Sequence, residues 1–146
     1  MEGRDNSGRI LAVDWGEKRI GIAISDETQT LARPIDVLKS SSRKENAGQI
    51  AAIAEEYDPA EIIVGVTYDA EGELTPSGRR ANRLADALRC VTPIRIRTVD
   101  EARSTQMAKE NKILIGSTRR SRRGHLDSEA AAVFLQQYLD KGQQSG

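Results

Sequence analysis

Two short apolar segments near the start of the chain, separated by a gap of hairpin size, constrain the fold most. Residues 10–13 form a branched apolar run that ends at Asp14, as expected of a buried strand. Residues 20–24 alternate isoleucine with glycine or alanine, a period of two that predicts a second strand. Because the intervening residues 15–19 fit a hairpin, we expect these two strands to pair antiparallel.

A third strand and then a first helix are expected to follow this hairpin. The third strand is predicted over residues 31–38, where Pro34 favours a sheet edge or a bulge. Apolar residues at helical spacing over 47–57 predict the helix. Asp58 should end it, because the residue before a proline is driven out of the helical region.

Strands and helices then alternate to the end of the chain. Buried or half-buried strands are predicted over 62–65 and 94–98, and a helix starts at Thr75 as N-cap with Pro76 in its first turn. Two more helices are expected, over about 104–112 and from about 126 to 141. This order predicts an α/β fold with one domain. It is a mixed five-stranded sheet, its first three strands antiparallel, flanked by helices.

The composition excludes several classes of protein. The 146 residues carry 22 Lys and Arg against 22 Asp and Glu, and this zero net charge excludes a histone-like polycation. The lone Cys90 excludes an internal disulfide and a cysteine zinc site. Without a signal-like or membrane-spanning apolar run, we expect a cytoplasmic protein. We expect a disordered lead over 1–8, the folded domain over 9–141 and a flexible tail over 142–146.

Carboxylates stand at the ends of three predicted elements. Asp14 ends the first strand, where α/β sheets bind ligands, although Asp14-Trp15-Gly16 also suits a plain turn. Asp100 and Glu101 follow the last strand, where they form either a site or a solvated strand end. Asp127 begins the last helix, at the centre of its apolar stripe, which suits either a cation ligand or an N-cap.

Taken together, these positions predict a metal site. Carboxylate oxygens suit Mg²⁺ or Mn²⁺ rather than zinc, and two such ions can activate water for phosphodiester cleavage. One histidine and one cysteine leave few parts for nucleophilic catalysis of the triad type. His125, beside Asp127, is either a proton-transfer residue or a surface loop residue.

A basic segment precedes Asp127. It contains Arg119, Arg120, Arg122, Arg123 and His125, and it reads either as a solvated loop or as a contact surface for a polyanion. Aromatic residues make up only 3% of the chain, so no evident stacking platform for single strands is present. We therefore expect recognition of the nucleic-acid backbone and its shape.

Several sequence blocks resemble the YqgF/RuvX family, whose members have an RNase H-like fold and are described as Holliday junction resolvases or pre-16S rRNA nucleases. The blocks follow the family order over nearly the whole chain, from about residue 9 to 139. They are Asp14–Ala23, Ala32–Pro34, Glu61–Gly65, Val99–Thr105 and His125–Ala132.

The resemblance implies a nuclease with Asp14, Glu101 and Asp127 as catalytic residues and metal ligands, holding Mg²⁺ or Mn²⁺ as two ions. The implied task is processing the 5′ end of pre-16S rRNA in ribosome biogenesis, by a monomer or a homodimer. Substrate contacts are expected from the basic residues Lys18, Arg19, Arg103, Arg119, Arg120, Arg122 and Arg123, and from His125.

Two alternatives to rRNA processing stay open. One is a Holliday junction resolvase acting on DNA, which needs a symmetric dimer for paired cuts. The other is a non-catalytic nucleic-acid-binding or ribosome-assembly module. The chain departs from the family pattern after Gly65, and Asp69 or Glu71 in that segment is a candidate to add a carboxylate to the site. Asp100, directly before Glu101, is a further candidate.

Overall fold

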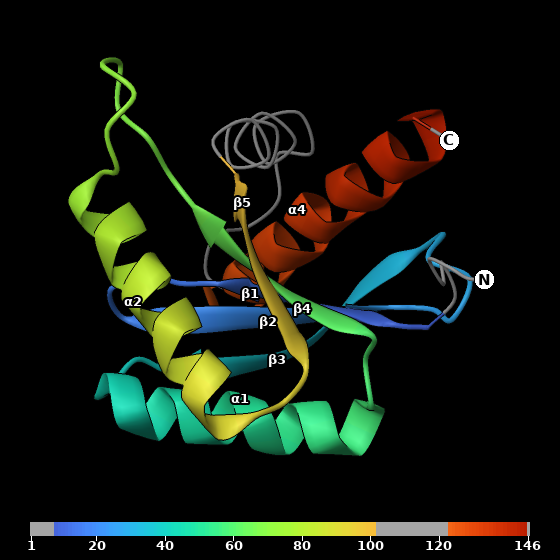
Figure 1. Ribbon diagram of the computed structural model, residues 1–146, viewed down its shortest axis with the longest axis horizontal. Coiled ribbons are helices and arrows are strands. Elements are labelled where there is room, and N and C mark those ends of the chain that lie inside the picture. Colours follow the sequence, from blue (N-terminus) through green and yellow to red (C-terminus); the bar gives the residue numbers. More distant parts are fainter. Residues whose placement is uncertain (1–7, 102–122, 146) are drawn as a thin grey trace.

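The protein is built on one mixed sheet of five strands. The computed structural model describes residues 8–101 and 123–145, and within 123–128 and 142–145 it describes only the course of the helix. The strand order is β3-β2-β1-β4-β5 (Figure 1). The strands are β1 (Ile10–Asp14), β2 (Arg19–Ser25), β3 (Ala32–Lys39), β4 (Glu61–Val66) and β5 (Arg95–Asp100).

Strand directions agree with the sequence-based prediction. β1 pairs with β2, and β2 with β3, antiparallel. β4 runs parallel to β1, and β5 runs parallel to β4, as the intervening helices require. The predicted mixed five-stranded α/β fold is thus confirmed, and β1, the first strand in sequence, lies at the centre.

β3 is an edge strand with an irregularity in its register, and both features suit Pro34. Proline has no N–H to donate to a strand ladder, which restricts it to edges and bulges. The register opposite β2 shifts at this point, from Ile22 against Asp36 to Ala23 against Pro34. Pro34 therefore occupies the kind of position that its chemistry permits.

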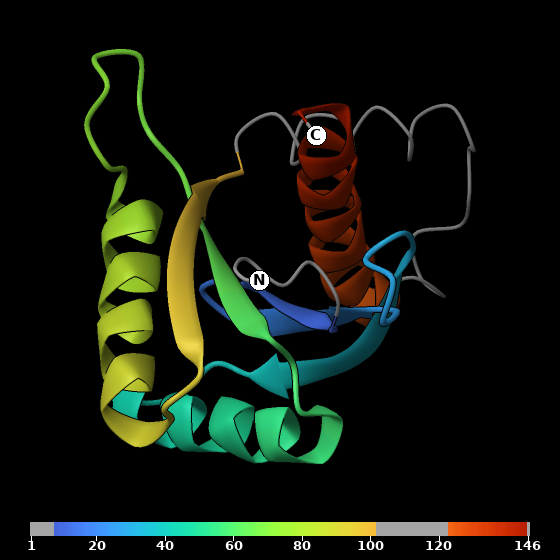
Figure 2. The same ribbon diagram turned by 45° about the vertical axis from the view of Figure 1, so that its right-hand side comes forward.

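Helices cover both faces of the sheet. Helices α1 (Arg43–Tyr57) and α2 (Pro76–Val91) pack on one face, and α4 (Arg123–Ser145) crosses the other (Figure 2). Strand residues alternate between the two resulting cores, so Leu11 and Val13 face α1 and α2 while Ala12 faces α4.

α4 is fixed to the sheet by large apolar side chains. Phe134, Leu135 and Leu139 are almost completely buried, and each buried side chain of this kind contributes about 1.5–3 kcal/mol. Gln136 adds two hydrogen bonds at the start of β3, accepting from the N–H of Ala32, its first residue, at 2.9 Å and donating to the carbonyl of Thr30, two residues earlier, at 2.8 Å. The helix is longer than expected, starting at Arg123 and ending at Ser145.

The ends of α1 and α2 follow the capping chemistry of the sequence. Thr75 is the N-cap of α2, its hydroxyl accepting from Gly78 N–H at 3.0 Å, and Pro76 follows as predicted. α1 ends before Asp58, which leaves the helical region for a left-handed conformation with φ 50°. The helix predicted over 104–112 lies outside the described residues.

Candidate active site

Three strands bring their carboxyl ends to one edge of the sheet. β1, β4 and β5 are parallel, with Val13 opposite Val64 and Gly65 opposite Val99. Asp14 is the last residue of β1, and Glu101 directly follows β5, its N–H donating to the Val66 carbonyl at 2.9 Å. The two carboxylates therefore flank the end of β4 from either side.

Alternation along the strands separates Glu101 from its neighbour Asp100. Val99 packs against the core under α4, so two residues later Glu101 returns to that face of the sheet. Asp14 shares this face, because Ala12 belongs to the same core. Asp100 falls on the opposite face and is exposed. Of the two adjacent acids, Glu101 is the one that accompanies Asp14.

Glu101 lies over Gly65 in β4. A β-carbon placed at position 65 would stand 2.6 Å from Cδ of Glu101 and closer still to Oε1. Glu101 is only 5% exposed, although burial of a carboxylate is costly unless the charge is compensated. The missing side chain of Gly65 is therefore what gives this buried carboxylate its place.

Asp14 and Glu101 line a common pocket of about 240 Å³. Ala130 of α4 closes one side, and the first two turns of α2 form the opposite wall with Ser77, Gly78 and Ala81. Gly78 also permits a close approach, since a β-carbon there would collide with the Thr67 carbonyl. The other lining residues are Trp15, Gly65 and Thr67.

The third predicted carboxylate is placed only by the course of its helix. Residue 127 belongs to α4, three positions before Ala130, which lines the pocket. The side chain of Asp127 lies outside the described part of the structure. Within the described part of the chain no three His, Cys, Asp or Glu side chains form a group that could hold a metal ion. The metal-binding role of Asp14, Glu101 and Asp127 accordingly stays a prediction.

The residues that are described nevertheless fit a divalent cation. Two carboxylates from different strands enter one pocket, and hard oxygen donors of this kind are what Mg²⁺ and Mn²⁺ prefer. A cation between them would offset both their mutual repulsion and the burial of Glu101. Gly65 supplies the space that this arrangement needs.

The predicted substrate-contacting residues are only partly described. Lys18, in the turn between β1 and β2, and Arg19, the first residue of β2, are exposed at the same edge of the sheet as Asp14. Together with Lys39 they line a second, open cavity of about 600 Å³. Arg103, Arg119, Arg120 and Arg122 lie outside the described residues, as do the side chains of Arg123 and His125 at the start of α4.

Asp69 and Glu71 do not line the pocket. The Asp69 carboxylate accepts the N–H groups of Glu71 at 3.0 Å and Glu73 at 2.9 Å, so it organises its own exposed loop. That loop is the projection between β4 and α2 seen in Figure 1. Asp69 thus shapes the loop, and neither acid is among the described residues that line the pocket.

Two features of the site were not predicted from the sequence. One is the contact of Gly65 with Glu101, for which a glycine at the end of an otherwise branched, buried strand is the available signal. The other is the wall of the pocket formed by α2, because the residues of a helix do not by themselves determine the angle at which it packs on a sheet.

Comparisons with known proteins agree with this architecture. The RuvX family model, described as Holliday junction resolvase, matches residues 8–141. A relative from Dictyoglomus thermophilum is 33% identical over 90% of this chain and 95% of its own length, and one from Bordetella pertussis is 35% identical over 90% and 92%. Both are named "Putative pre-16S rRNA nuclease".

Solved structures give the same fold. The RuvC protein of T. thermophilus in complex with a Holliday junction superposes with a TM-score of 0.55 at 15% identity, covering 92% of this chain and 95% of RuvC. The fowlpox virus resolvase bound to junction DNA gives 0.50 at 14% identity, covering 91% and 97%. The fold is therefore RNase H-like, and the names of the family and the relatives indicate a nuclease, as predicted. The chain belongs to the RuvX (YqgF) family.

Proposed function

We propose that this chain is a divalent-metal-dependent nuclease that cleaves structured RNA and processes the 5′ end of pre-16S rRNA. The observation that carries the proposal is the shared pocket of Asp14 and Glu101, with the buried carboxylate seated over Gly65. The names of the curated relatives support the substrate. An edge of a sheet with only a structural role does not require a buried carboxylate such as Glu101 in the same pocket as a second one, because burying a charge is costly.

In this proposal Asp14, Glu101 and Asp127 hold two Mg²⁺ or Mn²⁺ ions. When bound, such ions activate a water molecule and stabilise the negative charge on the leaving oxygen. The chain's own residues supply orientation. The Glu101 backbone is tied to β4 through Val66, and its buried side chain occupies the space that Gly65 leaves, so its oxygens lie in the pocket before substrate arrives.

A second candidate is resolution of Holliday junctions in DNA. The family model carries this description, and it matches nearly all of the chain. The two candidates differ in symmetry, because a resolvase makes paired cuts and needs two copies of the site in a dimer. A nuclease that trims an rRNA precursor works with one site.

A cleavage panel separates these possibilities. The wild-type protein, Asp14→Asn and the control Asp26→Asn are each given a pre-16S rRNA fragment and a four-way DNA junction, with Mg²⁺, Mn²⁺ or chelator. Asp26 lies beyond the far end of β2, in the turn that leads to β3. We expect RNA cleavage that needs a divalent ion, that Asp14→Asn abolishes and that Asp26→Asn leaves unchanged.

Three results would contradict the proposal in different ways. If Asp14→Asn retained divalent-ion-dependent cleavage, the pocket of Asp14 and Glu101 would not be the catalytic site. Symmetric paired cuts in the junction, with the rRNA fragment intact, would favour the resolvase. Binding of RNA with no cleavage under any ion would favour the non-catalytic module. Circular dichroism spectra of the variants show whether each is folded.

A further inference from the structure

An arginine of α2 lies over the tryptophan at the pocket. Cζ of Arg80 is 6.0 Å from the centre of the Trp15 ring, a distance at which a guanidinium is attracted to the face of an indole. Trp15 itself lines the pocket with Asp14 and Glu101, and it packs against the core under α1 and α2. The contact therefore places a cation at the rim of the candidate active site.

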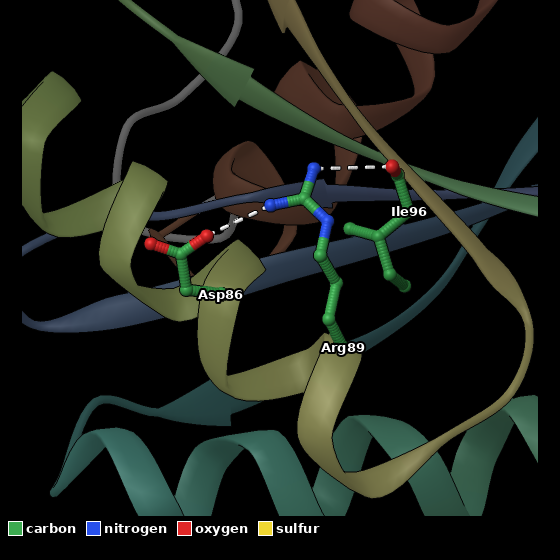
Figure 3. A network of polar contacts seen from close by, with 3 residues as sticks. All are labelled: Asp86, Arg89 and Ile96. Atoms are coloured by element: carbon green, nitrogen blue, oxygen red, sulfur yellow. Dashed lines mark hydrogen bonds and ion pairs between the residues drawn. The ribbon is translucent and has the colours of Figure 1, made fainter.

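The other arginines of α2 are engaged differently. Arg79 donates to the Leu74 carbonyl at 3.0 Å, within the loop before the helix. Near the far end of the helix, Arg89 binds Asp86 at 2.8 Å and the Ile96 carbonyl at 3.2 Å (Figure 3). Arg83 is exposed, one turn beyond Arg80. Arg80 thus differs from its neighbours in resting on a ring that borders the pocket.

The donors of Arg80 are available to an anionic ligand. Among residues 8–101 and the described side chains of α4, no carboxylate forms an ion pair with Arg80. A guanidinium presents five N–H groups in a planar fork that matches phosphate oxygens, and stacking on a ring leaves the edge of the fork accessible. The ring therefore attracts the guanidinium without using its hydrogen-bond donors.

A strand that approaches this pocket needs such a cation. The two carboxylates repel the phosphates on either side of the bond to be cut, and this repulsion is strong near a half-buried site. Contacts to phosphate oxygens from arginine also set the register of a nucleic acid on a protein. A cation at the rim of the pocket meets both needs.

We propose that Arg80, held over Trp15, binds a backbone phosphate of the nucleic-acid strand next to the bond in the pocket. Trp15 is a positioning residue in this arrangement, and Arg80 is a substrate-binding residue. The inference rests on the proposed nuclease function, and it adds α2 to the surfaces that hold the substrate.

The test measures binding and its dependence on salt. Arg80→Gln and the matched control Arg83→Gln, which removes the same charge one turn away, are each made in the Asp14→Asn background so that RNA is not consumed. Affinity for a pre-16S rRNA fragment is measured by fluorescence anisotropy from low to moderate salt. We expect Arg80→Gln to bind about tenfold more weakly, the usual effect of losing a hydrogen bond to a charged group.

The salt dependence distinguishes a phosphate contact from a structural effect. Loss of one phosphate contact lowers the slope of log K against log salt by about 0.7 to 0.9, whereas loosened packing leaves the slope unchanged. Arg83→Gln should keep both the affinity and the slope of the background protein. Equal slopes for the two variants would overturn the inference, whatever their affinities.

A third variant tests the role of the ring. Trp15→Leu keeps an apolar residue against the core but removes the aromatic face, and we expect it to reproduce most of the binding loss of Arg80→Gln. In the double variant the two losses should overlap rather than add. Additive losses would show that Trp15 does not act through Arg80.

Failure of this inference and failure of the proposed function give different results. If Asp14→Asn cleaves RNA as well as the wild-type protein does, the proposed function fails. If Arg80→Gln binds with the affinity and slope of Arg83→Gln while Asp14→Asn remains inactive, only the phosphate contact fails.

Discussion

Gly65 and Glu101 occupy a space that only one of them can fill with a side chain. Glu101 reaches back over β4 from the end of β5, and its carboxylate lies where the β-carbon of any other residue at position 65 would stand. The position of the buried acid in the pocket is thus decided by a neighbouring strand rather than by the residues around it in sequence.

Gly65→Ala should abolish most of the proposed nuclease activity while the protein stays folded. The added methyl group displaces the Glu101 carboxylate, and displacement of a catalytic group by about 1 Å costs on the order of 100-fold in rate. The measurement is the single-turnover rate of RNA cleavage at saturating Mn²⁺. Gly48→Ala in α1 is the control, since its β-carbon meets no atom within 4 Å. A wild-type rate for Gly65→Ala would show that Glu101 is not needed where it lies.

Thr75→Ala should lower both stability and activity. Thr75 caps α2 by accepting from Gly78 N–H, and it also pairs with the hydroxyl of Thr67, so the change loosens two residues of the pocket wall. Loss of a threonine cap costs about 1 kcal/mol. Ser42→Ala removes the cap of α1, which accepts from Glu45 N–H at 3.1 Å, and should cost similar stability with no loss of activity. Urea denaturation and cleavage rates together give the comparison. Equal cleavage rates for Thr75→Ala and Ser42→Ala would show that the N-terminus of α2 does not contribute to the candidate site.

Asp69→Ala should leave the metal requirement of cleavage unchanged. The Asp69 carboxylate is committed to two N–H groups of its own loop and does not line the pocket. Its loss should instead speed hydrogen exchange at the Glu71 and Glu73 amides. Glu101→Gln is the comparison, and it should raise the Mn²⁺ concentration needed for half-maximal cleavage. A similar rise for Asp69→Ala would make Asp69 a ligand after all.

Tyr138→Phe should change how stability depends on pH above 10. Burial, and then its hydrogen bond to Glu61 at 2.6 Å, raise the pKa of Tyr138 from its ordinary value of 10.0 to about 12. Between pH 10 and 12 the unfolded chain loses this proton while the folded protein keeps it, so stability falls as pH rises.

The tyrosine variant has no proton to lose at this position, so its stability should fall less steeply over the same range. At neutral pH it should be less stable by about 1 kcal/mol, because a hydrogen bond to a carboxylate is lost. Urea denaturation at pH 7, 9 and 11 measures both effects. Tyr57 and Tyr68 are present in both proteins and cancel in the comparison. If the stability of the two proteins fell equally with pH, the raised pKa of Tyr138 would be contradicted.

The sequence contains most of what decides the sheet. Alternation of apolar residues, the hairpin-sized gap after Asp14 and the Pro34 restriction are local signals, and the structure follows each of them. Helix ends were less well predicted. Asp58 leaves the helix as expected, but the left-handed conformation it adopts, with its N–H donating to the Ala54 carbonyl at 2.7 Å, is a property of the cap geometry.

The candidate site depends on relations that are not local. Asp14 and Glu101 share a pocket because of the order and register of three strands. The resemblance to a family implied that these two acids form one site, whereas the composition did not. The arginines of α2 lie away from the core, but which of them meets Trp15 depends on how the helix packs. Such contacts between distant residues emerge only once the sheet is assembled.

The central strand of the sheet is the first to be synthesised. β1 finds β2 at once, but its other neighbour, β4, is made only after α1, and Glu101 comes later still. A chain still emerging from the ribosome therefore has Asp14 without Glu101, the other carboxylate of the candidate site. Under the proposed function, which also needs Asp127, the nascent polypeptide cannot cleave the RNA of the ribosome making it before β5 and α4 have been made and have docked.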